Sequence, residues 1–308
     1  MKRYSAFVRY LIAFLALLFL TYLIWSKDFS QCVGMLSFSF AEYYSFLFPV
    51  FFLVPVNWLL EAVRWRILLS KVQTLSLKDA SLSVLMGLST AIMTPAQLGE
   101  FAGRLILVSS SCRKKAAFLW SLGGIMLTVA ILLWGLPAVA YYVHHWLVLD
   151  ALFEKKWTYA ILLGILFLVV FVLLLGVSRF YEQKIQKVKD LLSTISLKDM
   201  LNLILLSMLR CFVFSFQLVL MLKFYGLSES WLVMFVCVCV SYLIITFIPS
   251  FFFSDAVVRS SVAVLVFSPF ADSSLVVVSA SISLWILNVA IPTFVGALLV
   301  LFYSKKDC

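Results

Sequence analysis

The stretch TPAQLGEFAGR, residues 94–104, puts a proline, two glycines, a carboxylate and a guanidinium inside a strongly apolar chain. It separates two apolar arms, residues 80–94 and 101–112, and each arm is shorter than the roughly 20 residues that a spanning helix needs. Proline ends a helix because it lacks a backbone donor, and glycine allows the chain to turn. We therefore predict a hairpin that enters the membrane and returns to the same side, with Pro95 and Gly99 at its tip.

The composition of the whole chain indicates a membrane protein. Hydrophobic residues make up 64% of the 308 residues and charged residues only 12%, whereas soluble domains carry about 25% charged residues. Apolar runs of spanning length occupy residues 7–25, 43–60, 116–143, 157–177, 200–224 and 275–301. We predict an all-α, polytopic helical membrane protein with about six spanning helices in a single integral membrane domain.

A second pair of apolar arms resembles the first. Residues 231–248 and 256–270 flank Pro249, Ser254 and Asp255, and we predict a second re-entrant hairpin with Pro249 and Ser254 at its tip. The arm 231–248 is just long enough to span alone, so a full span is the alternative.

These elements predict an inverted repeat. Residues 1–150 and 151–308 each read span, span, hairpin, span, so three full spans per half turn the second copy upside down. Glu100-x-x-x-Arg104 in the first half then corresponds to Asp255-x-x-x-Arg259 in the second. Chance similarity between short apolar words is the competing explanation.

The basic residues predict the orientation. With both termini in the cytoplasm, only Lys27, Lys155, Lys156 and Lys223 fall in outer segments, and most of the 24 lysines and arginines fall in cytoplasmic ones. Such a bias is typical of membrane proteins. Because orientation accounts for the excess of basic residues, we expect no nucleic-acid partner.

Charged residues within the apolar arms are the candidate binding site. A charge at membrane depth costs about 2.5–3.5 kcal/mol on insertion scales, and arginine forms paired hydrogen bonds with phosphate. We predict that Glu100, Arg104, Asp255 and Arg259 meet in a polar cavity halfway across the bilayer and bind substrate there. A structural ion pair at each tip is the alternative.

Other arginines are further candidates. Arg210 lies near the middle of the run 200–224, and we expect it to pair with Asp255 or Glu100 or to contact the substrate directly. Arg64 and Arg66 end the second span beside tryptophans, which indicates an interfacial anchor or an entrance for a lipid head group.

The sequence contains no sign of metal or cofactor chemistry. None of the six cysteines has CxxC spacing, and there are only two histidines. No nucleophile–base pair is apparent, so we expect neither a metal nor a cofactor and no enzymatic activity.

Three short motifs resemble the transmembrane region of lysylphosphatidylglycerol synthases and its free-standing, flippase-like relatives. They are Arg64-Trp65-x-x-Leu68-Leu69, Ser76-Leu77-Lys78-Asp79 and Pro95-x-x-x-Gly99-Glu100-x-x-x-Arg104. The resemblance implies a multi-pass inner (plasma) membrane protein that moves a lipid between leaflets. The aminoacyl-transferase domain of the full-length synthases is absent from this sequence, so lipid synthesis is not implied.

The predicted function is therefore translocation of an anionic phospholipid or lipid-linked substrate, with membrane lipids as the partners. The alternatives are an ion- or proton-coupled small-solute transporter with the architecture of the DedA-type proteins, which also have paired hairpins, and a non-catalytic scaffold subunit. The sequence is compatible with a homo-oligomer and does not decide the oligomeric state.

Overall fold

The computed structural model describes residues 39–92, 99–146, 195–248, 250 and 252–302, and these residues contain helices and no strand. Four helices are long and apolar enough to cross a membrane, namely Ser39–Leu69, Arg113–Trp146, Leu197–Phe224 and Ser274–Phe302. They match four of the six predicted apolar runs. The other two runs, 7–25 and 157–177, lie outside the described residues.

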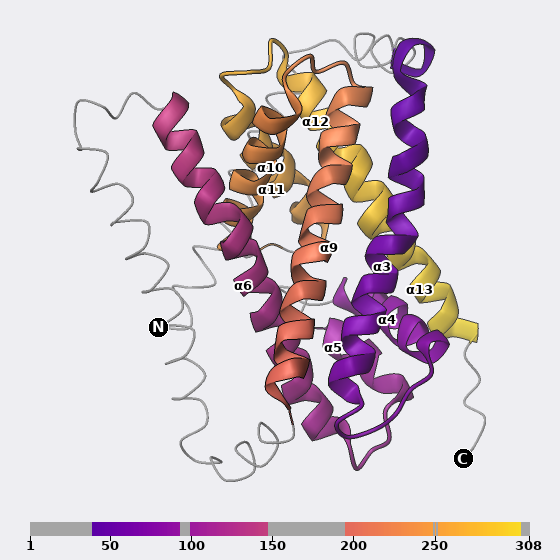
Figure 1. Cartoon of the computed structure of the whole chain (residues 1–308). Coiled ribbons are helices and arrows are strands. Elements are labelled where there is room, and N and C mark those ends of the chain that lie inside the picture. The colour runs from indigo at the N-terminus through magenta and orange to yellow at the C-terminus, as the bar shows by residue number, and fades with distance from the viewer. Residues whose placement is uncertain (1–38, 93–98, 147–194, 249, 251, 303–308) are drawn as a thin grey trace, which may run out of the picture.

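The elements follow one another in nearly the same order in both halves (Figure 1). The long helices are α3 (Leu47–Leu69, after the 3-10 turn η1, Tyr44–Phe46), α6 (Arg113–Trp146) and α9 (Leu197–Phe224). The fourth is built of α12 (Ser274–Trp285), the π-helical turn η4 (Ile286–Ala290) and α13 (Ile291–Phe302). The shorter elements are α4 (Leu77–Ala91), α5 (Glu100–Arg104), the 3-10 turn η3 (Leu105–Leu107), α10 (Trp231–Thr246) and α11 (Phe252–Phe267).

Serine side chains fix the start of three helices. The hydroxyl oxygens of Ser76 and Ser196 each accept the backbone N–H three residues later at 3.1 Å, and both residues begin the tetrapeptide Ser-Leu-Lys-Asp. Ser230 caps α10 in the same way at 3.3 Å. A helix start leaves backbone donors free, and these side chains satisfy one of them. The caps therefore place the starts of α4, α9 and α10 in polar loops from which apolar segments run.

The two predicted hairpins differ in their second arms. For the second pair, α10 and α11 lie close to the predicted arms. In the first pair α4 forms, whereas the second predicted arm, residues 101–112, is helical only through α5 and η3, which end at Leu107, and the backbone is extended at Val108. The Ser83 hydroxyl donates to the Arg104 carbonyl at 2.9 Å, so a side chain of α4 bonds a carbonyl that a longer helix would have used.

The long helices position the short pairs at opposite ends (Figure 1). α3 packs against α9, and the pair α4–α5 adjoins the end where α3 finishes and α9 begins, whereas α10–α11 adjoins the other end. α4 packs on α13 and α10 packs on α6. One helix of each short pair therefore packs on the last long helix of the other half of the chain.

Two glycines permit the close packing of α4 on α13 and of α10 on α6. A Cβ atom on Gly296 of α13 would lie 1.9 Å from the carbonyl oxygen of Leu85 in α4, and one on Gly135 of α6 would lie 2.8 Å from the Cβ of Leu243 in α10. Small residues at helix contacts let two backbones approach closely. These two contacts between the halves therefore depend on glycines, which carry no side chain.

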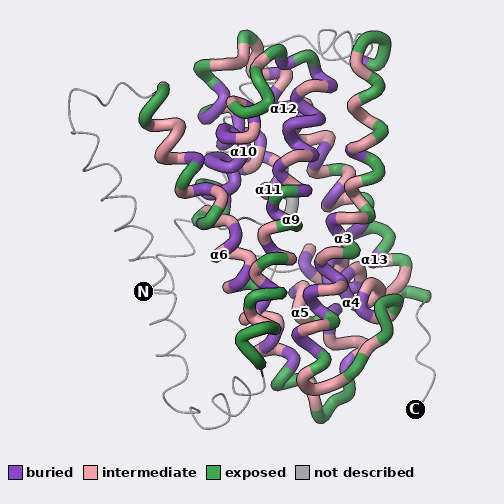
Figure 2. Tube along the Cα trace, in the orientation of Figure 1, coloured by how far each residue is buried: buried purple, intermediate pink, exposed green. Residues whose placement is uncertain are grey.

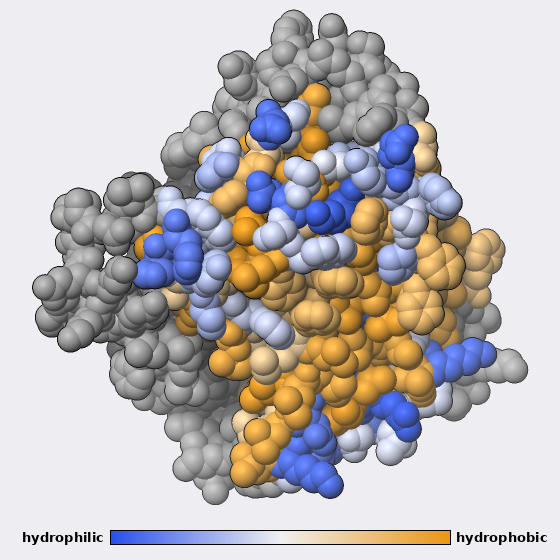
Figure 3. Space-filling view, turned by 45° about the horizontal axis from the view of Figure 1, so that its top comes forward, coloured by the Kyte–Doolittle hydropathy of each residue, from blue (hydrophilic) through white to orange (hydrophobic). Residues whose placement is uncertain are grey.

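The outer surface is apolar. Buried residues lie in the interior of the helix bundle and exposed ones face outward (Figure 2). Large apolar side chains such as Phe48, Leu205 and Phe294 are 79%, 62% and 66% exposed, and Figure 3 shows a broad hydrophobic area with hydrophilic side chains above and below it. Such a surface suits the hydrocarbon of a bilayer, so the described helices form a membrane protein.

Candidate functional site

A cavity of about 480 Å³ with charged and apolar side chains in its wall lies among the long helices and the two short pairs. Its walls come from α3, α4, α5, α6, α9, α10, α11 and η4. The five predicted binding residues all line it: Glu100, Arg104, Arg210, Asp255 and Arg259. Folding thus brings two acid–arginine couples, Glu100 with Arg104 and Asp255 with Arg259, to one cavity, although they are far apart in the sequence.

Arg104 is the most firmly held charge of the first couple. Its guanidinium bonds the carboxylate of Glu100, four residues earlier, through Nε at 3.0 Å and also through Nη2. Nη2 also donates to Oε1 of Glu61 at 2.7 Å, and the group lies over the ring of Trp65 at 5.5 Å from the centroid. With a side chain 3% exposed, Arg104 connects α5 to α3 and offers the cavity little free surface.

The carboxylate of Glu61, on α3, is the centre of the charge cluster. Its Oε1 bonds Arg104, while its Oε2 bonds Nη1 of Arg64 at 2.5 Å and Nη1 of Arg210 at 2.9 Å. One anion therefore holds three guanidinium groups, which come from α3, α5 and α9. Each of these groups would be costly to bury alone.

Sequence reasoning did not assign a role to Glu61, because its segment was interpreted from the tryptophans and arginines at the end of a span. A signal was nevertheless present. Glu61 follows Asn57 by four residues, and Arg64 and Trp65 follow Glu61 by three and four residues, so all four share one side of the helix. A carboxylate that shares one side of a helix with an amide and a guanidinium indicates a buried hydrogen-bond network.

The predicted partners of Arg210 were wrong. It pairs with Glu61 instead of Asp255 or Glu100, and its Nε donates to Oδ1 of Asn57 at 3.2 Å. The reason is that α9 packs along α3, whose inner side carries both partners. The Arg210 side chain keeps 17% exposure, so part of the guanidinium faces the cavity.

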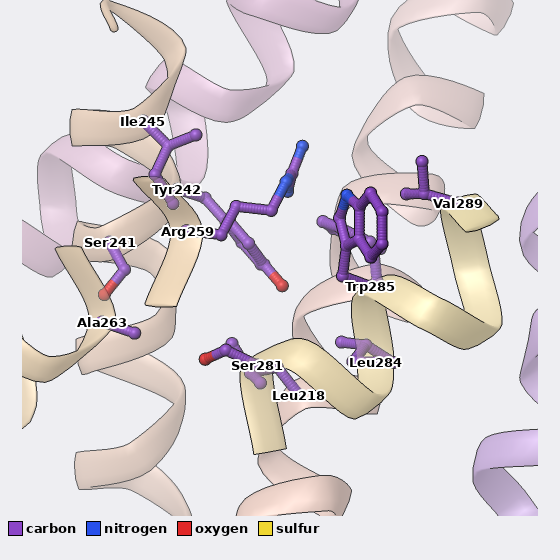
Figure 4. A pocket seen from close by; sticks show the side chains of 11 residues that line it. Leu218, Ser241, Tyr242, Ile245, Arg259, Ala263, Ser281, Leu284, Trp285 and Val289 are labelled. Carbon is purple, nitrogen blue, oxygen red and sulfur yellow. The ribbon is translucent and has the colours of Figure 1, made fainter. Parts of the chain in front are cut away.

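Asp255 and Arg259 form the second couple. Arg259 Nε donates to Asp255 Oδ2 at 2.7 Å, and the same oxygen accepts Trp285 Nε1 at 3.1 Å. Ser250 donates to the other oxygen at 3.0 Å. Asp255 is buried by these partners, whereas the Arg259 side chain is 24% exposed. Figure 4 views a smaller cavity of about 20 Å³ that shares Arg259, whose side chain extends into the space between Tyr242 and Trp285.

Buried amides extend the network away from Arg210. Asn57 Nδ2 donates to Asn288 Oδ1 at 3.3 Å, and Asn288 Nδ2 donates to Gln217 Oε1 at 3.2 Å. Asn288, which sequence reasoning missed, lies in the π-helical turn η4. Such turns inside α-helices are frequent at functional sites. The amides tie α3, α9 and the last long helix together beside the cavity.

Arg64 and Arg66 do not form a common head-group entrance. Arg64 lines the cavity, is 3% exposed and donates from Nη2 to the carbonyl of Gly123 at 2.7 Å. Arg66 is exposed and does not line it. Positions two apart on a helix differ by about 200° in direction, so these side chains lie on opposite sides.

The predicted tip residues are only partly described. Gly99 is the N-cap of α5 with φ −65°, a conformation open to every residue, and its carbonyl accepts the Thr90 hydroxyl at 2.6 Å. Ser254 lies in the first turn of α11. Pro95 and Pro249 lie outside the described residues, so their place at the hairpin tips stays a prediction.

The charge of the cavity wall favours an anionic ligand. The guanidinium groups of the cavity wall are Arg64, Arg104, Arg210 and Arg259, and the carboxylates are Glu61, Glu100 and Asp255. Among the described residues of the wall, the buried Nε1 of Trp58 and Nε of Arg64 have no hydrogen-bond partner. Both groups donate only. These two donors have almost no exposed surface, so the preference rests on the one positive charge in excess, which suits an acceptor that carries negative charge.

The fold and the cavity define a class: a helical membrane protein that encloses charged side chains among helices able to span a membrane. No group of three His, Cys, Asp or Glu residues within the described ranges could hold a metal ion. No protein-family model matches the chain, and no curated protein is similar to it in sequence. The resemblance to the lysylphosphatidylglycerol synthase transmembrane region therefore stays a prediction from its short motifs.

Proposed function

We propose that this protein moves an anionic phospholipid, or a lipid-linked anionic head group, between the leaflets of the inner membrane. The observation that supports it is the excess of guanidinium groups in a cavity surrounded by helices of spanning length. Guanidinium keeps its charge in poorly hydrated sites and bonds phosphate oxygens in pairs. The phosphate would pass through the cavity while the acyl chains stay in the hydrocarbon.

The proposed membrane arrangement has six spans and two re-entrant hairpins in an inverted repeat, with both termini in the cytoplasm. The hairpins of such transporters bring their tips together near the midplane, and the pairs α4–α5 and α10–α11 approach the cavity from opposite ends of the long helices. Supporting the orientation, the described Lys and Arg residues outside the cavity all lie at the end where α3 finishes, except Lys223.

A lateral opening favours a lipid over a soluble solute. Gly124 of α6 and Thr246 at the end of α10 line the cavity and are exposed, and we propose that the cavity opens toward the bilayer beside them. A lipid needs such an opening because its chains cannot enter a closed polar space, whereas a carrier of small solutes must close its cavity against lipid. A scaffold subunit would have no need for buried charges that are costly to insert.

The direct test is the transfer rate of a fluorescent phosphatidylglycerol in proteoliposomes. Arg259→Ala removes a partly exposed guanidinium of the cavity, and a hydrogen bond to a charged group is worth about 1.5–3 kcal/mol. We expect the rate above that of protein-free vesicles to fall roughly tenfold or more. The readout is the fraction of label that an impermeant quencher reaches with time.

Arg66→Ala is the matched control, because Arg66 is an exposed arginine outside the cavity. It should transfer lipid at the rate of the unchanged chain. Transfer by Arg259→Ala at that same rate would overturn a phosphate-binding role for the cavity, provided that equal amounts of each protein are inserted.

A further inference from the structure

We propose that Glu61 is an internal competitor of the ligand: its carboxylate occupies Arg210 until a phosphate group of the ligand displaces it. The inference deepens the proposed function and rests on it for the lipid source of that phosphate. It follows from how unequally the three guanidinium groups around Glu61 are held.

Two of these groups have other strong partners. Arg104 is also bonded to Glu100 and lies over Trp65. Arg64 is also bonded to the Gly123 carbonyl, and both side chains are 3% exposed. Moving either group would break several buried contacts, so neither is free to leave Glu61.

Arg210 is held less firmly. Beyond its 2.9 Å contact with Glu61 it has one hydrogen bond, to Asn57 at 3.2 Å, and it lies over the Trp58 ring at 5.6 Å. Its side chain is 17% exposed. If Arg210 leaves, Glu61 still has two guanidinium partners, so no buried carboxylate loses its only counter-charge. The exchange therefore costs one ion pair, which the incoming anion replaces.

The neighbourhood of Arg210 shows where the anion would bind. Phe214 follows Arg210 by four residues on α9, and the guanidinium of Arg259 lies over the Phe214 ring at 5.6 Å. Arg210 and the ring that carries the Arg259 guanidinium therefore start about one helical turn apart on α9, and both guanidinium groups are partly exposed in the same cavity. A phosphate has enough oxygens to bond both groups, which would connect the charge cluster around Glu61 to the couple of Asp255 and Arg259.

Such competition would keep binding reversible. Guanidinium bonds phosphate and carboxylate with the same geometry, so Glu61 can retake Arg210 when the ligand leaves. A carrier needs this reversibility, because a ligand held too tightly is not released to the other leaflet.

The test measures dissociation constants of the purified full chain for two probes, dioctanoyl-phosphatidylglycerol and inorganic phosphate. Glu61→Gln removes the competing charge, and we expect both probes to bind about tenfold more tightly, which corresponds to about 1.4 kcal/mol. Glu100→Gln is the charge-matched comparison, because it removes a carboxylate of the same cavity that bonds Arg104 and not Arg210. Its effect should be several-fold smaller.

Equal gains in affinity for the two variants would show a general effect of charge and overturn the inference, as would an unchanged affinity of Glu61→Gln. If Glu61→Gln does not fold, Asn57→Ala answers the same question without a change of charge. That variant frees one of the two bonds of Arg210 and should also tighten binding; unchanged binding overturns the inference.

The two probes separate this inference from the proposed function. If phosphate binding follows the expected pattern and the lipid does not bind, Glu61 is a competitor and lipid transport is wrong. If the unchanged chain transfers lipid but Glu61→Gln binds the two probes no more tightly than Glu100→Gln, only the inference that Glu61 competes with the ligand is wrong.

Discussion

Arg104 and Arg259 occupy corresponding positions in the two predicted repeats, yet their surroundings differ. Arg104 has two carboxylate partners and is almost fully buried, whereas Arg259 has one partner and is about a quarter exposed. The same acid-x-x-x-Arg pattern therefore produces a structural connection at one tip and a cavity-facing charge at the other.

This difference predicts unequal effects on stability. Arg104→Ala leaves Glu100 without its guanidinium and removes the link between α5 and α3, so we expect a loss of about 3 kcal/mol in the free energy of unfolding. The measurement is denaturant-induced unfolding in detergent. Arg66→Ala, at an exposed position, should change stability by less than about 0.5 kcal/mol. A loss for Arg259→Ala as large as that for Arg104→Ala would contradict the distinction.

For individual residues, the sequence predicted the two i, i+4 acid–arginine couples and the cavity that they share. It did not predict which residues elsewhere in the chain bond to them. A couple four residues apart is local, so its pairing follows from helix geometry. Glu61 and Asn288 reach partners 43 to 231 residues away in the chain, and such contacts depend on how α3, α9 and the last helix pack.

Among the elements, α4 and α13 approach each other closely at a glycine. The carbonyl of Leu85 lies where a Cβ on Gly296 would be. In the same region of the last helix, η4 replaces a regular turn and places Asn288 beside the cavity. The last long helix thus serves both as a support for α4 and as part of the cavity wall.

Gly296→Ala should therefore separate α4 from α13. We expect it to destabilise the protein by about 1–3 kcal/mol, a typical cost of overpacking, as measured by thermal unfolding in detergent. Gly124→Ala is the comparison, because a Cβ at that helical glycine would meet no atom within 4 Å. It should be neutral or slightly stabilising, since alanine favours helix over glycine. Equal unfolding temperatures for the two variants would contradict the close packing.

Run length and composition predicted the described long helices well, because about 20 apolar residues in sequence are needed for one span. The second arm of the first hairpin was predicted less well. Its residues are apolar enough for a helix, but Ser83 bonds the Arg104 carbonyl and Gln73 accepts the Ser109 N–H at 3.0 Å. These partners come from other segments, which periodicity does not reveal.

The whole molecule has unlike ends. The end where α3 finishes carries basic residues of its loops and helix starts, namely Arg66, Lys71, Lys78, Arg113, Lys114, Lys115 and Lys198. The opposite end carries Lys223 among the described Lys and Arg residues. Because basic loops stay in the cytoplasm, the first end is the proposed cytoplasmic one.

Cysteine labelling tests this orientation. Ser110→Cys and Ser228→Cys place exposed thiols at the basic and the opposite end, in a chain whose six native cysteines are replaced by serine or alanine. In intact cells an impermeant maleimide should label Ser228→Cys only, and it should label both after lysis. Labelling of Ser110→Cys in intact cells would reverse the proposed orientation.

The reciprocal seating of α4 on α13 and of α10 on α6 has a mechanical consequence. A tilt of the long helices in one half displaces the short helices of the other, so neither half can rearrange independently. If the protein moves a lipid head group as proposed, widening the compartment toward one leaflet would narrow it toward the opposite leaflet in the same motion, and the head group would meet water on one side at a time.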